Sequence, residues 1–464
     1  MRYNLDIVVV SNIPKDPGAG VEVIVGLPTK DPRSLPFASR KIFAERMEHY
    51  DVFIHAEDDI LITEENIDSF LDATALLPVN EIAGFVHAEE DHKRNLYFDP
   101  PHASFHWDPS SVKKRGKYTL AHFTNVQSAC FILTLQQLKL AIASGGFLVE
   151  PHEEGRYEMI ESAANDPYTQ CGFKKLVPVS HLEQFTVRHL PANKWSTRPY
   201  RASAEFHRQI DALLGLEETG RPKSLLFAPE TKVLHRKWSK DYYELVRKEI
   251  VSNIPERVQT VLSVGCGWGA IEGWLVQKGV RVVGIPMDSV IAACAEARGV
   301  EIVYGDLEQA RKSLEGKAFD CLLLSSVLHL VDDPVALLSS YGELLAPGGT
   351  VLATAPNFSQ VTARWRRFRG VAHYKHLGDY AKTGMHATTP RIVCEWFRRC
   401  SLTATRLAYV IPERGQLLNR LLLGFAGSLL GEEFICVGER QGHARKTAHA
   451  VEIQQQQNAL LTEP

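Results

Sequence analysis

The chain has 464 residues, which is enough for two domains that each bury a core. Its 52 basic residues nearly balance 55 acidic ones, with a formal net charge of −3, which excludes the strongly basic surface of proteins that bind nucleic acid through charge. Its eight cysteines include no Cys-x-x-Cys pair, so we expect free thiols rather than a disulfide or zinc framework, as in the reducing cytoplasm.

The first residues, MRYNLDIVVVSN, contain too short an apolar run for a signal peptide. No run of 18 apolar residues occurs elsewhere, so the sequence predicts no transmembrane segment. We therefore expect a cytoplasmic protein.

Strand-like and helical patterns alternate along the first 200 residues. Short apolar runs predict strands at residues 5–10, 21–25, 52–54, 82–86, 130–134 and 176–179. Helical periodicity predicts helices at residues 40–50 and 135–143. This alternation indicates an α/β domain.

Three consecutive acids, Glu57, Asp58 and Asp59, follow the strand expected at residues 52–54. Thr63 comes next and is a good N-cap for a helix. The acids therefore lie at the carboxyl end of a strand, where α/β sheets bind ligands, and carboxylates there suit a divalent cation. The alternative is that they only solvate the start of the helix.

With this motif, and with the downstream segments CFILTLQQL, YEMIESAANDPYTQCGF and VRHLP, the first half resembles GT-A-type glycosyltransferases. The resemblance implies a Rossmann-related sheet that binds a nucleotide sugar together with Mn²⁺ or Mg²⁺. The metal ligands would be Glu57, Asp58, Asp59 and His189. Glu161 and Asp166 would face a glycan acceptor as catalytic acids.

The run LDIVVVSN is similar to the second strand of that fold rather than to its first strand. We therefore expect either an abbreviated domain or a natural start that lies upstream.

The strand pattern fades over residues 201–235, which include the charged segment GLEETGRPKS. We expect a first domain at 1–200, a linker at 201–235 and a second domain at 236–440. The last residues, 441–464, contain QQQQ and are expected to be a disordered polar tail.

The second half begins with a helical pattern over residues 238–254 and then alternates again. Strands are predicted at residues 261–264, 280–285, 301–304, 321–324 and 350–353. The first of these leads into the turn of VLSVGCGWG, in which Gly265, Gly267 and Gly269 precede a helix. Strand, glycine-rich turn and helix together aim backbone N–H groups at an anionic ligand.

From about residue 238 to 440 the chain resembles class I S-adenosylmethionine-dependent methyltransferases, on this turn and on the runs YGDLE, FDCLLLSSVLHL, APGGT and EEFICVGER. The resemblance implies a Rossmann-like seven-stranded sheet with S-adenosylmethionine as its cofactor. The implied donor-binding residues are Gly265, Cys266, Gly267 and Gly269 at the amino-acid end, Asp306 beside the adenine, and Ser326 near the sulfonium. Pro286 stands where the family has an acid for the ribose, and Asp288 is expected to replace that acid.

A sulfonium is already an activated methyl donor, so alignment of donor and acceptor supplies most of the rate. A general base is needed if the acceptor is a hydroxyl. His329 and His386 are the candidates for that base, and a packing role is the alternative for each.

The segment RWRRFRG, residues 364–370, places four arginines among two aromatic residues. It could contact an anionic acceptor or the headgroups of a membrane as a peripheral contact. A solvated surface helix is the alternative.

The sequence thus predicts a bifunctional transferase that adds a sugar to a surface glycan or its precursor and then methylates it. Two alternatives remain: a methyltransferase with a non-catalytic carbohydrate-binding first domain, and a binding or scaffold protein in which both sites are degenerate. The sequence leaves the oligomeric state open.

Overall fold

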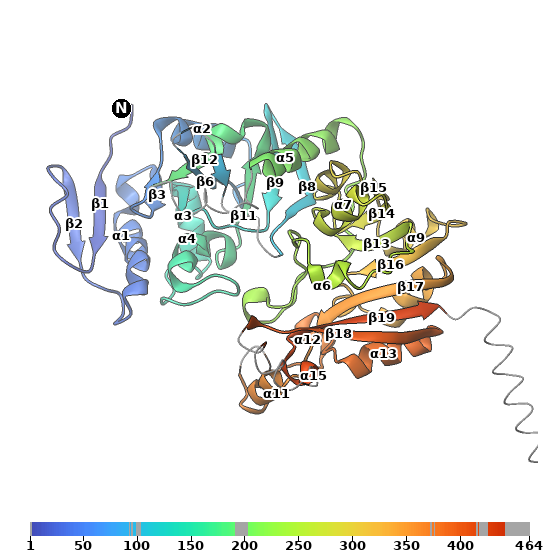
Figure 1. Cartoon of the computed structure of the whole chain (residues 1–464). Coiled ribbons are helices and arrows are strands. Elements are labelled where there is room, and N and C mark those ends of the chain that lie inside the picture. The colour runs from blue at the N-terminus through green and yellow to red at the C-terminus, as the bar shows by residue number, and fades with distance from the viewer. Residues whose placement is uncertain are drawn as a thin grey trace, which may run out of the picture. The chain divides into compact units, whose positions relative to one another are not determined.

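The computed structural model describes residues 2–440 apart from 92, 94–95, 99–103, 191–202, 372–373, 375, 414–415 and 417–425. The chain forms two compact units, Met1–Lys223 and Ser224–Pro464. Both units combine β-sheets with helices, as the alternating patterns predict (Figure 1).

The described residues of the first unit form four small sheets. Two have four strands, in the orders β5 (Glu81–Ala83), β11 (Lys174–Pro178), β9 (Tyr118–Phe123), β8 (Trp107–Arg115) and β4 (Ile60–Leu61), β12 (Thr186–His189), β6 (Val86–Glu90), β7 (Leu96–Phe98). The two-stranded sheets are β10 (Cys130–Thr134) with β3 (Val52–Ala56) and β1 (Ile7–Ser11) with β2 (Val21–Val25).

The N-cap that the sequence predicts at Thr63 is confirmed for one of the helices of the first unit. These helices are α1 (Ala38–Arg46), α2 (Glu64–Thr74), α3 (Leu135–Ala143), α4 (Met159–Thr169) and α5 (Ser203–Glu218), with 3-10 turns at Pro32–Phe37, Met47–His49 and Val179–Phe185. The hydroxyl of Thr63 accepts a hydrogen bond from the Asn66 amide, which fixes the first turn of α2. Fully buried aromatic rings, including those of Phe70 and Phe131, form the core.

The segment expected to be a linker is not a separate part of the fold. Helix α5 belongs to the first unit, where the Phe206 ring stacks on Phe98 with ring centroids 4.2 Å apart. Leu225, in contrast, pairs with Asp288 of the second unit. Sequence reasoning missed helix α5 and the pairing of Leu225, because the apolar residues of segment 201–235 are spread among many charged residues. Residues 441–464, the expected tail, lie outside the described residues.

The second unit is built on one seven-stranded sheet. Its order is β15 (Glu301–Ile302), β14 (Arg281–Pro286), β13 (Thr260–Cys266), β16 (Phe319–Leu324), β17 (Leu345–Pro356), β19 (Glu433–Arg440) and β18 (Leu402–Val410). Strand β19 runs antiparallel to β17 and β18, whereas the other neighbours are parallel. The chain moves outward from β13 to β14 and β15 and then returns to β16 on the other side. The carboxyl ends of β13 and β16 therefore form a topological switch point, where open α/β sheets bind ligands.

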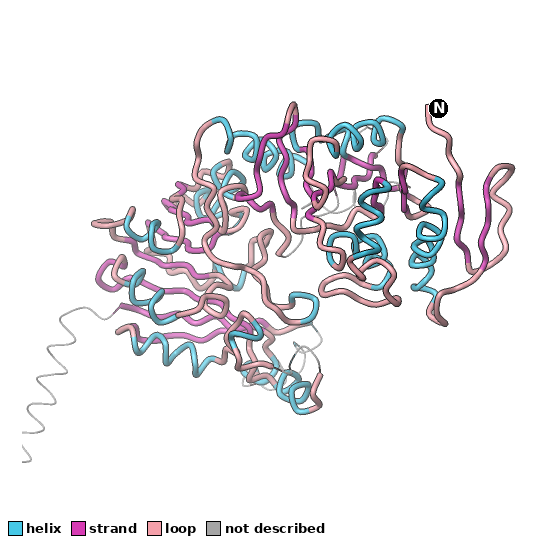
Figure 2. Tube along the Cα trace, turned by 180° about the vertical axis from the view of Figure 1, so that it is seen from behind, coloured by secondary structure: helices cyan, strands magenta, loops and turns pink. Residues whose placement is uncertain are grey.

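Helices flank this sheet, cyan beside magenta in Figure 2. They are α6 (Lys248–Val251), α7 (Ala270–Gln277), α8 (Ala292–Glu296), α9 (Leu307–Lys312), α10 (Pro334–Gly342), α11 (Val361–Phe368), α12 (Tyr380–Thr383), α13 (Pro390–Arg399) and α15 (Gly427–Leu430). The strands of the sheet interior are buried on both faces, as expected for parallel strands covered by helices.

Two secondary-structure predictions for the second unit were too long. The helix expected over residues 238–254 is reduced to α6, and the strand expected over 301–304 ends at Ile302. All eight cysteines are free thiols. Within the described residues, no helix has the length and apolarity needed to cross a membrane.

Candidate functional site

The glycine-rich turn joins β13 to α7 at the switch point. Gly265 and Gly269 have φ angles of 78° and 79°, in the left-handed region that favours glycine. A Cβ added at Gly267 would lie 2.2 Å from the carbonyl oxygen of Tyr242, which also accepts a 2.8 Å hydrogen bond from the Trp268 amide. Each glycine is therefore required by the chain's own backbone, independently of any ligand.

A short segment, residues 224–226, which we call the strap, lies along the chain that follows β14. The amide of Leu226 donates to the Met287 carbonyl at 2.9 Å, and the amide of Ser289 donates to the Ser224 carbonyl at 3.1 Å. Leu226 is buried, and its side chain would lie 3.9 Å from a Cβ at Gly265. The strap thus packs beside the glycine-rich turn, and sequence reasoning missed it because its pairing joins distant residues.

Asp288, the expected substitute for the ribose-binding acid, is only 1% exposed. One of its carboxylate oxygens accepts hydrogen bonds from the amides of Val290 and Ile291, at 2.7 and 2.8 Å. Burial, together with the Asp288 charge, raises the pKa of the Tyr242 hydroxyl well above its usual value. Burial and these contacts favour a capping role for Asp288 in the turn after β14 over the expected ribose contact, which stays a prediction.

Cys266 and Asp306 are two further residues expected to bind the donor, at the end of β13 and after β15. Cys266 is buried at the end of β13, and its carbonyl accepts a 2.9 Å hydrogen bond from the Met287 amide. Asp306 is exposed after β15 and caps α9, with one oxygen accepting 2.9 Å hydrogen bonds from the amides of Glu308 and Gln309. The cap uses that oxygen alone, so the adenine contact stays a prediction.

Ser326 follows β16 in the left-handed region, with φ 54°. Its amide donates to the Thr354 hydroxyl at 2.9 Å. A non-glycine residue held in this conformation is a feature that clusters at functional sites, because the surrounding structure must over-determine it.

Two charged residues that the sequence did not indicate hold the preceding residue, Ser325. The buried ammonium of Lys240 donates to the Ser325 carbonyl at 2.6 Å. The Ser325 hydroxyl donates to the carboxylate of Glu244 at 2.7 Å. The sequence gives no local signal for them, because Lys240 stands between Ser239 and Asp241 and both charges lie well before β13. They fix the end of β16 from outside the sheet.

The Nε2 atoms of both candidate bases are hydrogen-bonded to backbone carbonyl groups of the chain. His329 is 1% exposed, its Nε2 donates to the Trp238 carbonyl at 2.8 Å, and burial lowers its pKa to about 4. His386 donates from Nε2 to the carbonyls of Val331 and Asp332, at 3.0 and 3.1 Å, and stacks on Tyr380. These contacts favour the packing role for both histidines.

In the first unit, the structure brings Asp59 and His189 together. Strands β4 and β12 pair antiparallel, with Ile60 opposite His189, and this places the Nε2 atom of His189 3.2 Å from a carboxylate oxygen of Asp59. The Nδ1 atom of His189 lies 3.3 Å from the carboxylate of Glu89, which is fully buried on β6. Glu89 was missed because its position depends on the parallel pairing of β6 with β12.

The acids of the EDD motif form the turn between β3 and β4. The amide of Glu57 donates to the Ala129 carbonyl at 3.0 Å, and Asp58 is exposed. Within the described residues, no group of three or more His, Cys, Asp or Glu side chains is arranged to hold a metal ion. The metal assignment stays a prediction.

The donor set nevertheless fits a metal in part. Metal-binding histidines commonly donate their second ring N–H to a carboxylate, and Glu89 lies where it would accept such a bond from His189. Asp59 and the Nε2 atom of His189 would then be two of the metal ligands.

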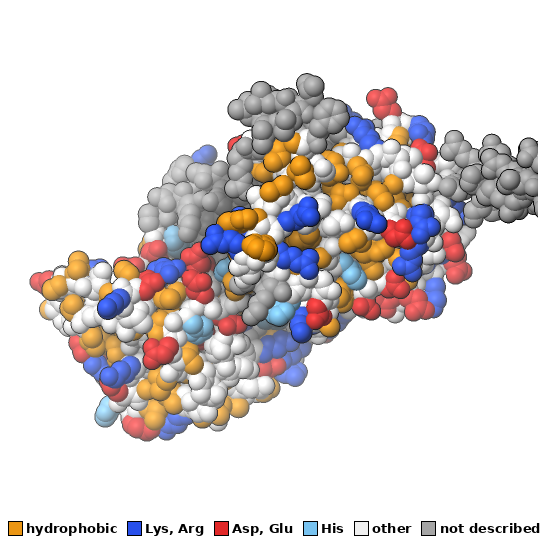
Figure 3. Space-filling view, turned by 90° about the horizontal axis from the view of Figure 1, so that it is seen from below, with side chains coloured by type: hydrophobic (Ala, Val, Ile, Leu, Met, Phe, Trp, Pro, Cys, Tyr) orange, Lys and Arg blue, Asp and Glu red, His pale blue; other side chains and the backbone are white. Residues whose placement is uncertain are grey.

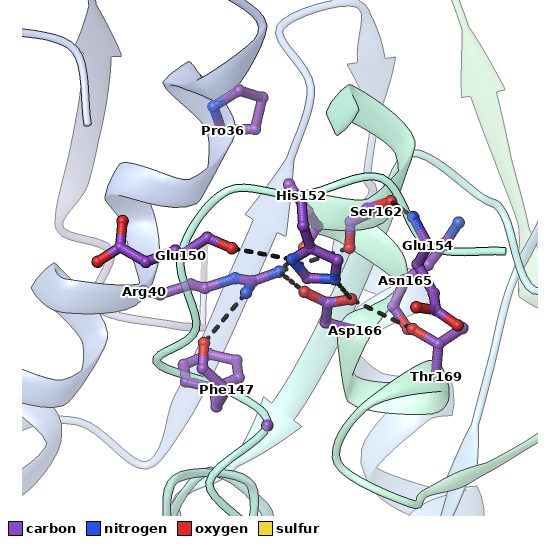
Figure 4. Close-up of polar contacts among 12 residues, drawn as sticks. Pro36, Arg40, Phe147, Glu150, His152, Glu154, Ser162, Asn165, Asp166 and Thr169 are labelled. Atoms are coloured by element: carbon purple, nitrogen blue, oxygen red, sulfur yellow. Dashed lines mark hydrogen bonds and ion pairs between the residues drawn. The ribbon is translucent and has the colours of Figure 1, made fainter. Parts of the chain in front are cut away.

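Asp166, expected to face an acceptor, is instead at the centre of a buried cluster (Figure 4). Its side chain is 0% exposed, and one oxygen lies 2.6 Å from Nη2 of Arg40. The other oxygen accepts from the Thr169 hydroxyl at 3.2 Å and lies 3.4 Å from Nε2 of His152. Arg40 also donates to the Phe147 carbonyl at 3.1 Å, and burial lowers its pKa. These contacts favour a structural role for Asp166, and its catalytic role stays a prediction.

Glu161 is at the start of α4. Its carboxylate accepts a 3.1 Å hydrogen bond from the Glu158 amide, so that it takes part in the capping box of this helix. This contact accounts for an acid at position 161 without a glycan acceptor, and the catalytic role of Glu161 stays a prediction.

Comparisons with known proteins point to the second unit. The model of a family described as "Methionine biosynthesis protein MetW" matches residues 246–374. The ubiquinone biosynthesis O-methyltransferase of Pseudomonas paraeruginosa is 32% identical over 105 residues, which are 21% of this chain and 45% of that protein. The corresponding enzyme of Cereibacter sphaeroides is 29% identical over 114 residues, 24% of this chain and 46% of that protein. The chain thus spans less than half the length of these relatives.

Solved methyltransferase structures are also similar at low identity. A protein from Methanosarcina mazei, described as an S-adenosylmethionine-dependent methyltransferase, is 19% identical with a TM-score of 0.32, over 43% of this chain and 100% of that one. A possible histamine N-methyltransferase from Thermotoga maritima is 16% identical with a TM-score of 0.32, over 42% and 86% of the two chains. The strand order of the second unit and the match over residues 246–374 together identify a Rossmann-like methyltransferase fold.

Proposed function

We propose that the second unit is an S-adenosylmethionine-dependent methyltransferase. The observation that carries this proposal is the glycine-rich turn at the switch point of a seven-stranded sheet, in the part of the chain that the family model matches. S-adenosylmethionine would supply a methyl group that its sulfonium has already activated. The names of the curated relatives favour a hydroxyl acceptor.

In this proposal, the residues near the glycine-rich turn bind different parts of S-adenosylmethionine or position the acceptor. Backbone amides of the turn would bind the donor carboxylate, and Asp306 would accept a hydrogen bond from the adenine amino group. The contacts of Ser325 with Lys240 and Glu244 would keep the end of β16 in place, so that donor and acceptor stay aligned. With Pro286 at the end of β14 and Asp288 buried, we propose that the ribose is held without a carboxylate.

Titration calorimetry tests the donor site. We expect heat on addition of S-adenosylmethionine, and roughly tenfold weaker binding for Asp306→Ser, because this change removes the carboxylate while a serine still caps α9. Asp333→Ser is the matched control, since Asp333 caps α10 through the same two hydrogen bonds and loses the same charge. Its affinity should equal that of the unaltered chain. No heat with the unaltered chain would overturn the proposal.

We further propose that the first unit is a GT-A-type glycosyltransferase that binds a nucleotide sugar with Mn²⁺ or Mg²⁺. The observation that favours it is the meeting of Asp59 with His189, with Glu89 behind the histidine. A metal there would neutralise charge that develops on the leaving diphosphate. The two units would then act on one surface glycan or its precursor, first adding a sugar and then methylating a hydroxyl.

Asp59→Asn tests this second proposal, because it removes a charge with little change of shape. We expect Mn²⁺ affinity to fall at least tenfold and metal-dependent sugar transfer to be lost, while S-adenosylmethionine still gives heat. Asp72→Asn, an exposed acid on α2, is the control and should leave both unchanged. Transfer that survives both a chelator and Asp59→Asn would contradict the metal assignment. Mn²⁺ binding without any transfer would instead favour a carbohydrate-binding role for the first unit.

A further inference from the structure

Helix α11 of the second unit exposes a stripe of large apolar side chains. Val361, Trp365 and Phe368 are 52%, 54% and 90% exposed. Their spacing of four and three residues puts all three on one side of the helix. Ala363, on the opposite side, is buried in a small core cluster with Tyr374 and other residues. The stripe therefore faces away from the body of the unit.

Arginines flank this stripe. Arg364 and Arg369 fall within about 80° of it on either side, given 3.6 residues per turn. The guanidinium of Arg369 lies 4.8 Å from the centre of the Trp365 ring, and Arg367 donates to the Leu377 carbonyl at 3.2 Å. In the part of the chain that the structure describes, the arginines of residues 364–369 form no ion pair with an acid. Their charges are thus available to an external anion.

A cavity of about 730 Å³ adjoins the same helix. Arg364 and Arg367 line it, together with Arg391 of α13 and the rings of Phe358 and Tyr409. On the face of the molecule seen in Figure 3, orange apolar side chains alternate with blue Lys and Arg side chains. Apolar surface, a basic rim and a basic hollow therefore occur together.

We propose that α11 is a peripheral membrane anchor that binds the surface of an anionic phospholipid bilayer. Trp365 and Phe368 insert at the level of the headgroups, the arginines contact lipid phosphates, and the cavity receives a headgroup. A soluble polyanion would satisfy the arginines but would leave the apolar stripe in water, whereas a bilayer surface satisfies both. The proposal is independent of the proposed transferase activities, because it uses none of their residues.

Vesicle co-sedimentation with the full chain tests the anchor. We expect sedimentation with phosphatidylcholine vesicles that contain phosphatidylglycerol, weaker sedimentation at high salt, and little with phosphatidylcholine alone. The double variant Trp365→Ser, Phe368→Ser and the triple variant Arg364→Gln, Arg367→Gln, Arg369→Gln should each lower the vesicle affinity at least tenfold. All five side chains are exposed, so unchanged melting curves should accompany these losses.

Matched controls remove the same chemistry elsewhere in the second unit. Arg257→Gln, Arg281→Gln, Lys312→Gln removes three positive charges, and Leu245→Ser, Val246→Ser removes two exposed apolar side chains. Both controls should sediment like the unaltered chain. Lipids brominated on their acyl chains should also quench tryptophan fluorescence, and Trp365→Phe should remove that part of the quenching.

Three outcomes would overturn the anchor. They are equal sedimentation of the α11 variants and the unaltered chain, equal binding to neutral vesicles, and binding of inorganic pyrophosphate without any binding of vesicles. The last outcome would show that the ligand of α11 is a soluble anion and not a membrane.

Discussion

Arg40→Leu is expected to destabilise the first unit by about 3–5 kcal/mol, because it leaves the carboxylate of Asp166 buried without its cation. Asp166→Leu should destabilise the unit by a similar amount, because it leaves the guanidinium of Arg40 buried without its carboxylate. The double variant Arg40→Leu, Asp166→Leu removes both buried charges and should recover much of the loss, since a buried ion pair stabilises little over apolar residues of similar size. Urea unfolding of the full chain, with hydrogen exchange of α1 and α4 as the readout for this unit, would measure all three.

Arg46→Leu is the matched control, because it lies on the same helix and pairs with Glu22 at the surface. It should hardly change the stability, as is usual for exposed ion pairs. Asp166→Asn keeps the shape and removes the charge. If this variant kept its stability and lost sugar transfer alone, Asp166 would have the catalytic role that the sequence predicted.

The burial of Asp166 marks a limit of the sequence. In a segment rich in acids, the sequence pattern around an acid is the same whether its side chain faces solvent, a substrate or a buried arginine. The residue that decides, Arg40, is 126 positions away along the chain. Only the packing of α1 against α4 reveals that the carboxylate is neutralised within the protein.

The second unit was more predictable because its signals are local. Strand, turn and helix follow one another within residues 260–277. Gly265 and Gly269, which adopt the left-handed conformation, lie within the turn that needs it. The strap was not predictable, because residues 224–226 pair with 287–289, across β13, α7 and β14. The burial of Asp288, which disfavours its expected ribose contact, accompanies that pairing.

The approach of Asp59 to His189 was predictable to an intermediate degree. Asp59 and His189 stand at motifs that the sequence singled out, and the pairing of β4 with β12 brings them together. Glu89 has no motif of its own, since VHAEE reads as an ordinary strand. Its contact with His189 follows from which strands become neighbours in the sheet.

The second large effect is expected at Gly267. A Cβ there would meet the backbone of Tyr242, at 2.2 Å from its carbonyl oxygen and 2.8 Å from its carbonyl carbon. Neither atom can move easily, because the Trp268 amide donates to the same oxygen at 2.8 Å. The position that a side chain of residue 267 would take is therefore occupied by the chain itself.

Gly267→Ala should consequently cost about 3 kcal/mol or more in the stability of the second unit, at the upper end of the range for overpacked cores. Gly342→Ala is the matched control, since a Cβ at that position of α10 would meet nothing within 4 Å, and alanine in a helix should be neutral or slightly stabilising. Denaturant unfolding and calorimetry with S-adenosylmethionine should be run on the same samples, so that lost binding is assigned to lost folding. A Gly267→Ala chain that unfolds like the unaltered one and yet gives no heat would show that the glycine serves the donor directly.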